Sequence, residues 1–228
     1  MPCVNGTRGF FCCITGPHQQ SIERRKVEHT FERGAIVFHE GERAHAVHCI
    51  QRGVVKLYKL GPEGEELVIR LLGPGDIMGY RPLLADDLFA ATARVLEETT
   101  VCTFNREFLF KLLRESPELA MHIMKKLASE LRVSEDQMVS RIVENVPQRT
   151  ARFLLWLFDA KRLAEDRTPY ESALRREDMA MVIGTTPETL SRILHELERR
   201  KILDLSRKSI RVREPKLLRH LADLGTLN

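Results

Sequence analysis

The chain has 228 residues, which is enough for one large domain or for two modest domains with separate cores. It contains no apolar run near the roughly 20 residues of a membrane span and no signal-peptide pattern, and its five cysteines are an odd number that does not suit a closed disulfide framework. We therefore expect a cytoplasmic protein with no membrane partner. The net charge of +4 is uneven: residues 147–228 carry 17 Lys and Arg against 12 Asp and Glu, a basic balance typical of proteins that bind nucleic acid phosphates.

The first 26 residues form a cysteine-bearing segment, and the sequence after them is β-like from about Phe31 to Phe104. Short apolar runs in this stretch are separated by Gly, Pro and acidic residues at intervals that suit tight turns. Strands at this spacing predict a small antiparallel roll or barrel, which we assign to residues 27–115.

The sequence becomes helical after Asn105, and a long helix is expected from Ser116-Pro117 to about Val143. A helix of about 27 residues is about 40 Å long, which is long for a helix that only covers a small roll. A helix that packs on its own domain gives the same apolar spacing as a coiled coil, but this length favours dimerisation along residues 116–146, with a joint at 144–147. The apolar stripe recurs every four or seven residues, at Ile123, Leu127, Leu131, Met138 and Ile142.

Residues 147–228 contain a predicted helix-turn-helix between 175 and 201. An apolar first helix breaks at Gly184, Thr186 then stands where an N-cap belongs, and Pro187 occupies the first position of the second helix. A polar loop is expected at 165–172 before this motif. After it, residues 202–212 read as a two-stranded wing with Arg207 and Lys208 at its tip, and a short helix at 215–224 closes the chain.

The second helix of the motif carries a chemically distinct exposed side. Glu188, Ser191 and Arg192 lie three and four residues apart, so their side chains leave the helix together, while the opposite side is apolar. Such a helix suits the DNA major groove, where Glu accepts a hydrogen bond from cytosine N4 and Arg makes a paired contact to guanine. An ordinary helical hairpin with a solvated face is the alternative.

A glycine-punctuated roll, a long dimer helix and a winged helix-turn-helix, in this order, resemble the bacterial CRP/FNR family of transcription regulators over about residues 27–225. The resemblance implies an α+β fold with a cyclic-nucleotide-binding-like β-roll, and a homodimer whose two recognition helices enter successive major grooves about 34 Å apart. Double-stranded DNA and RNA polymerase are the partners that it implies. The best-matched residues are Gly41, Gly53, Gly73, Gly75, Asp76 and Gly79 in the roll and Thr186, Glu188, Thr189, Ser191 and Arg192 in the recognition helix.

The Glu-x-x-Ser-Arg arrangement resembles the FNR branch of the family, which reads TTGAT-like half-sites. It implies an inverted repeat related to TTGAT–N4–ATCAA, with Arg192 on guanine, Glu188 on the paired cytosine and Ser191 on thymine or a neighbouring phosphate. Thr186, Thr189, Arg207 and Lys208 complete the expected DNA-binding set. We find no motif of an enzyme active site, so an enzyme is not expected. A sensor or scaffold of the same fold that does not bind DNA is the alternative function.

Cyclic AMP is not the expected signal. Family members that bind a cyclic nucleotide place an acid after the glycine that follows Gly-Asp and Arg-Ser or Arg-Thr about ten residues later, whereas this chain has Tyr80 and Ala90-Ala91. A buried phosphate without a cation is costly. Arg70, Arg81 and Arg94 could serve a different anion, although a structural or surface role is the simpler expectation for each.

The cysteines suggest a redox or oxygen signal. Cys102 aligns with the roll cysteine that completes the iron–sulfur cluster of oxygen-sensing FNR proteins, and Cys3, Cys12 and Cys13 would supply the other three thiolates. The spacing departs from the family pattern because Cys12 and Cys13 are adjacent, so Cys49 is kept as a substitute ligand. Buried cysteines are also common as small apolar residues. An iron–sulfur cluster, thiol redox chemistry, an unidentified ligand such as haem, and no cysteine role at all therefore stay open.

Overall fold

The computed structural model describes residues 11, 14, 17–163, 170–171, 175–206 and 209–225. The chain divides into two compact units, residues 1–132 and 133–228, and the boundary falls inside the long helix. The first unit holds a β-roll and the second a winged helix-turn-helix, which confirms the predicted α+β architecture. None of the helices within the described ranges is both long and apolar enough to cross a membrane.

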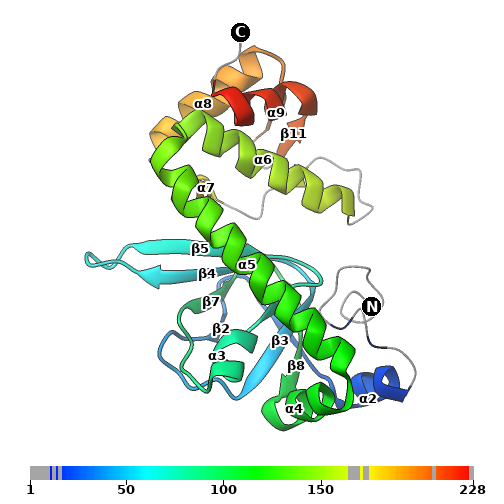
Figure 1. Cartoon of the computed structure of the whole chain (residues 1–228). Helices are drawn as coiled ribbons and strands as arrows, with labels where there is room; N and C mark the ends of the chain where they lie inside the picture. The colour runs from blue at the N-terminus through cyan, green and yellow to red at the C-terminus, as the bar shows by residue number, and fades with distance from the viewer. Residues whose placement is uncertain are drawn as a thin grey trace. The chain divides into compact units, whose positions relative to one another are not determined.

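Within residues 27–105, all of which the structure describes, eight strands form two four-stranded antiparallel sheets (Figure 1). The strand orders are β1-β8-β3-β6 and β2-β7-β4-β5, and the two sheets enclose an apolar core between them. The strands are β1 (Val27–Phe31), β2 (Ile36–Phe38), β3 (Ala46–Arg52), β4 (Val55–Leu60), β5 (Glu66–Leu72), β6 (Ile77–Met78), β7 (Thr92–Val95) and β8 (Thr99–Asn105).

Helices α2 (Pro17–Arg25), α3 (Tyr80–Ala85) and α4 (Arg106–Glu115) accompany the roll, and Figure 1 shows α2 next to α4. Of these three helices, only α4 was expected, as part of the helical sequence after Asn105. Part of the N-terminal segment also belongs to this unit, because Phe11 is fully buried in the roll core with its ring centroid 5.0 Å from that of Phe104, and Ile14 is buried beside it.

Helix α5 (Pro117–Val143) begins and ends where the sequence predicted. Its first turns pack on the roll, because Ile123 is only 3% exposed and Leu127 contacts the same core. Both members of the predicted dimer stripe therefore contact their own protomer. Ile123 has almost no surface left for a partner copy, which corrects the prediction for it, whereas Leu127 is only partly buried and stays a predicted dimer residue. Leu131 and Met138 are 62% and 67% exposed, and the Ile142 side chain lies outside the described structure.

The second unit contains α6 (Val146–Leu163), α7 (Arg176–Ile183), α8 (Pro187–Arg199) and α9 (Pro215–Leu224). Its strands β10 (Leu203–Leu205) and β11 (Ser209–Val212) form the predicted wing hairpin. The prediction of a polar loop at 165–172 is partly wrong. Strand β9 (Tyr170–Glu171) pairs with β11 and extends the wing to a three-stranded sheet.

Candidate DNA-binding site

Local sequence determines where the candidate recognition helix α8 begins. Gly184 ends α7 in a left-handed conformation with φ of 75°, which glycine adopts at little cost. Two residues later the Thr186 hydroxyl accepts a hydrogen bond from the Thr189 N–H at 3.2 Å, and Pro187 holds the first helical position. The predicted N-cap is therefore confirmed, and the turn between α7 and α8 is short and well defined.

Helix α8 buries one side and exposes the other. Leu190, Leu194 and Leu197 are each 1% exposed and pack into the domain core. Glu188 and Arg192 are exposed, and neither makes an ion pair with any residue that the structure describes. The carboxylate and the guanidinium that were predicted to read a base pair are therefore presented to solvent. Ser191, between them in sequence, is half-buried.

Two residues that we did not single out from the sequence share this exposed side of α8. His195 and Arg199 follow Glu188 and Arg192 at spacings of three and four residues, and both are exposed. The His195 ring nitrogen Nδ1 lies 3.3 Å from a carboxylate oxygen of Glu198. The helical period alone could have identified them, since it continues the stripe begun by Glu188.

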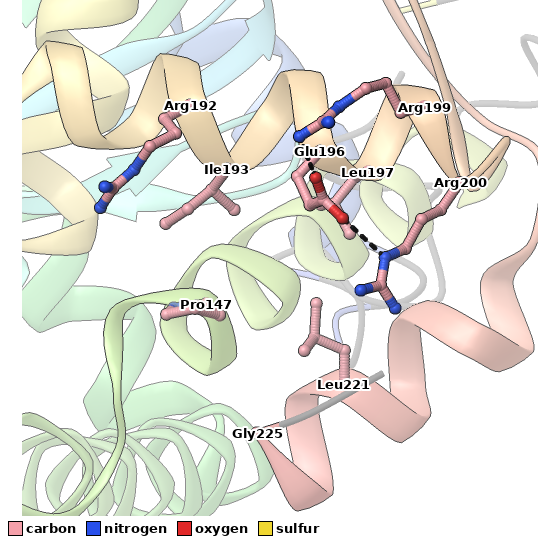
Figure 2. Close-up of a pocket in the computed structure, with 9 residues that line it drawn as sticks. All are labelled: Pro147, Arg192, Ile193, Glu196, Leu197, Arg199, Arg200, Leu221 and Gly225. Atoms are coloured by element: carbon pink, nitrogen blue, oxygen red, sulfur yellow. Dashed lines mark hydrogen bonds and ion pairs between the residues drawn. The ribbon is translucent and has the colours of Figure 1, made fainter. Parts of the chain in front are cut away.

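A pocket of about 360 Å³ lies beside α8, between the first turn of α6 and the end of α9 (Figure 2). Arg199 and Arg200 both pair with the Glu196 carboxylate, with the Arg200 Nε 2.8 Å away. The hydrogen bond from Arg200, followed by the charge of Arg199, holds the pKa of Glu196 below its ordinary value. The pocket therefore has a basic rim over an apolar floor. Its lining residues are Pro147, Arg192, Ile193, Glu196, Leu197, Arg199, Arg200, Leu221 and Gly225.

The wing lies after α8 in the chain. Arg207 and Lys208, the predicted basic tip, fall outside the described residues. The hairpin on either side of them is closed by the Ser206 N–H, which donates to the Ser209 carbonyl at 2.9 Å. An ion pair of 2.6 Å joins Asp204 on β10 to Arg213, the residue that follows β11.

Tyr80, which stands in the sequence where an acid was expected in a cyclic-nucleotide site, contacts the chain's own long helix. Tyr80 is buried, and its hydroxyl donates to Glu130 of α5 at 2.7 Å. Arg70 and Arg81 pair with the same carboxylate at 2.9 and 3.2 Å. Burial alone would raise the pKa of Glu130, but the Tyr80 hydrogen bond and the Arg70 charge lower it below its ordinary value. The third arginine considered, Arg94, pairs with Glu66 and donates to the Tyr58 hydroxyl.

Two cysteines face each other across neighbouring strands of the roll. Cys49 on β3 and Cys102 on β8 are register partners, and both are at most 1% exposed. Cys49 is disulfide-bonded, whereas the Cys102 thiol is free and accepts a hydrogen bond from the Gln51 amide. Burial raises the pKa of Cys102 above its ordinary value, against the opposing charge of Lys26.

These contacts bear on the predicted cluster ligands. A disulfide sulfur is not a thiolate, so Cys49 does not serve as a substitute ligand in this state. Cys3, Cys12 and Cys13 lie outside the described residues. Among the residues that are described, no group of three or more His, Cys, Asp or Glu side chains could hold a metal ion, so these residues by themselves do not form a cluster site.

Comparison with known proteins covers both units. The family model of the cyclic nucleotide-binding domain matches residues 28–116, and that of the Crp-like helix-turn-helix domain matches residues 148–221. The chain is 30% identical to the cyclic AMP receptor protein of Thermus thermophilus, over 84% of this chain and 86% of that protein. It is 26% identical to the fumarate and nitrate reduction regulatory protein of Vibrio cholerae, over 90% of this chain and 81% of that protein.

Among solved structures, FixK2 from Bradyrhizobium japonicum superposes with a TM-score of 0.77 at 27% identity, covering 86% of this chain and 96% of FixK2. This chain has a roll that matches the cyclic nucleotide-binding domain, a long helix and a region that matches the Crp-like helix-turn-helix domain. The chain therefore belongs to the CRP/FNR family of DNA-binding transcription regulators and is not an enzyme.

Proposed function

We propose that the protein binds, as a homodimer, an inverted repeat related to TTGAT–N4–ATCAA and controls transcription by RNA polymerase in response to a redox signal. The observation that supports the DNA site is that Glu188 and Arg192 are exposed, without an ion pair to any described residue, on a helix whose other side is buried. In the groove, Arg192 would donate to guanine O6 and N7 while Glu188 accepts from the amino group of the paired cytosine. Ser191 would contact thymine or a phosphate.

A titration of the wild-type protein against this repeat at several salt concentrations tests the DNA-binding proposal. Contacts between Lys or Arg and phosphates release counterions, so log affinity should fall linearly with log salt. A scrambled duplex of the same length is the control, and the repeat should bind at least about 1,000-fold more tightly. A salt slope near zero would favour the scaffold alternative, and equal affinity for both duplexes would contradict the proposed sequence.

The dimer proposal rests on a free apolar stripe of α5. Met124, Leu131 and Met138 are seven residues apart, and each exposes more than half of its surface. Seven-residue spacing keeps the three side chains on one side of a supercoiled helix, as in a two-stranded coiled coil. A second copy of the same helix would cover this stripe and would give the two-fold symmetry of an inverted repeat.

We expect Leu131→Asp to convert the dimer to a monomer, because a carboxylate would be buried against its own copy in the partner. The mass measured by light scattering should halve, and the affinity for the inverted repeat should fall at least about 100-fold because the second half-site contact is lost. Ser129→Asp is the matched control: it adds the same charge at an exposed position about 200° around the helix. A dimeric Leu131→Asp protein would show that another surface mediates dimerisation.

For the signal, we favour thiol chemistry in the roll over cyclic AMP. Arg70, Arg81 and Arg94 already pair with carboxylates, so a cyclic phosphate would have to break an ion pair to gain a cation. Cys49 and Cys102 are cross-strand neighbours in the core that also buries Phe11 of the N-terminal segment. Oxidation of two thiols forms one S–S bond and passes two electrons and two protons to an oxidant such as a peroxide. Because Cys49 is disulfide-bonded and the Cys102 thiol is free, the bond that would be reduced and formed again is the disulfide of Cys49. Opening it would change how the roll core packs around Cys49.

Anaerobic purification followed by a visible spectrum, iron and sulfide assays and thiol titration distinguishes the candidate signals. We expect a colourless, iron-free protein that gains two reactive thiols on reduction and whose DNA affinity differs between the two states. In Cys49→Ser this difference should vanish, while Cys102→Ser tests whether the free thiol beside Cys49 also takes part. A brown, oxygen-bleached protein would instead establish an iron–sulfur cluster.

A further inference from the structure

One guanidinium joins the helix joint to the turn of the helix-turn-helix. Arg149, in the first turns of α6, donates from Nη1 to the Glu144 carbonyl at 2.6 Å. Its Nε donates to the Ile183 carbonyl at 2.8 Å and its Nη2 to the Gly184 carbonyl at 3.2 Å. All four residues belong to the same compact unit, 133–228.

The acceptors explain why an arginine is needed here. Ile183 is the last residue of α7 and Gly184 caps it, so their carbonyls have no partner in the next turn and carry the partial negative charge of a helix C-terminus. Guanidinium is planar and carries donors in fixed directions, so it can bind three carbonyls on two segments at the same time. A lysine ammonium would reach fewer of them.

The joint between α5 and α6 also makes hydrogen bonds to a second part of the same domain, the end of α9. Helix α5 ends at Val143 and α6 begins at Val146, so only Glu144 and Asn145 lie between the helices. Asn145 and Gln148 form a reciprocal capping pair, with each side chain 3.0 Å from the other's backbone N–H. Their amides also donate, at 3.4 Å each, to the carbonyls of Gly225 and Asp223 at the end of α9.

We propose that Arg149 is a positioning residue that couples the backbone at Glu144 to the orientation of the recognition helix. A displacement of the Glu144 carbonyl moves a rigid guanidinium, and the carbonyls of Ile183 and Gly184 move with it. Because Thr186 starts α8 only two residues after Gly184, α8 follows. This inference rests on the proposed function of α8 in reading DNA.

The first test compares Arg149→Ala, Arg149→Lys and Arg152→Ala on a duplex that the wild-type protein enriches from a random pool. Arg152 is the matched control, because it binds the Glu144 side chain at 2.7 Å but makes no described contact with the turn. Arg149→Ala should lose about tenfold or more in affinity for the enriched duplex and about twofold or less for unrelated DNA, with Arg149→Lys between it and the wild type. Arg152→Ala should stay within about twofold of wild type.

Failure to enrich any duplex would refute the proposed function, whereas enrichment with a wild-type-like Arg149→Ala would refute only the coupling. Equal losses on both duplexes would also overturn it, because they would mean that Arg149 contributes general affinity. Fluorescence of Trp156, the one tryptophan of the chain, monitors folding of this unit. If Arg149→Ala unfolds, Arg149→Lys decides, and wild-type affinity for that variant overturns the proposal.

A second test separates coupling from simple structural support. Glu144→Ala and Glu144→Gly both remove the side chain, but only glycine loosens the backbone whose carbonyl Arg149 binds. In the wild-type background the two variants should differ in affinity for the enriched duplex by about threefold or more, and in Arg149→Ala they should be equal. The same ratio in both backgrounds would show that the joint and the turn are independent.

Discussion

Replacing Arg192 with alanine is expected to cost about 1–3 kcal/mol of binding free energy for each half-site of the inverted repeat and little on unrelated DNA. The guanidinium is exposed and unpaired among the described residues, so its loss should leave the folded domain unchanged. What disappears is the paired contact to guanine, which a water molecule cannot reproduce in the same geometry. Mobility-shift titrations on the repeat and on a scrambled duplex measure the difference.

Arg199→Ala is the matched control for this prediction. Arg199 lies two turns further along the same exposed side of α8 but pairs with Glu196, so its replacement should weaken binding to both duplexes alike and only slightly. Replacing the G·C pair of the half-site should lower the DNA affinity of the wild-type protein but not that of Arg192→Ala. The contact between Arg192 and guanine is already absent in the variant, so changing the DNA removes nothing more. Equal losses on both duplexes for Arg192→Ala would contradict the assigned role.

Local sequence signals account for the elements that were predicted well. Proline at the first helical position starts both α5 at Pro117 and α9 at Pro215, and these helices have the predicted bounds. The turn before α8 was also predictable from local sequence, because Gly184 and Thr186 determine the conformation of the residues next to them. The exposed side of α8 follows from its 3.6-residue period, which places Glu188 and Arg192 opposite the buried leucines.

Contacts between distant residues account for what was missed. Strand β9 exists only because Tyr170 and Glu171 pair with β11, almost 40 residues later in the chain. The dimer stripe was partly misassigned because a helical period identifies an apolar side and does not reveal what covers it, which for Ile123 is the roll. Likewise, Arg149 finds its acceptors in a turn 34 residues away, and no short motif marks it.

The sequence alone did not predict which contacts Tyr80 makes. The sequence shows Tyr80 where an acid would bind a ribose, which excludes a contact but suggests no replacement. In the structure the Tyr80 hydroxyl and Arg70 both bind Glu130 of α5, 50 residues beyond Tyr80 in the chain. The roll therefore contacts the long helix through the side chains of Tyr80 and Arg70.

The largest stability effect is expected for Gly53→Ala, in the tight connection between β3 and β4. Gly53 has a φ of 94°, and a Cβ there would lie 2.2 Å from the Thr99 hydroxyl oxygen and 2.7 Å from the Glu98 carbonyl. Thr99 is fully buried and its hydroxyl is hydrogen-bonded, so the neighbouring backbone has little freedom to move away. The left-handed conformation should cost about 1–2 kcal/mol and the overpacking about 1–3 kcal/mol more in the free energy of unfolding.

Gly34→Ala separates these two contributions. Gly34 has almost the same φ, 91°, but a Cβ there would meet nothing within 4 Å, so only the conformational cost of about 1–2 kcal/mol should appear. Hydrogen exchange of the β3 and β8 amides measures the stability of the roll in both variants, separately from that of the DNA-binding unit. A single melting temperature would combine the unfolding of the two units. If the two variants lose equal protection, the close approach of Glu98 and Thr99 to Gly53 does not hold in solution. A greater loss for Gly53→Ala would show that this approach, and not the left-handed turn alone, requires glycine between β3 and β4.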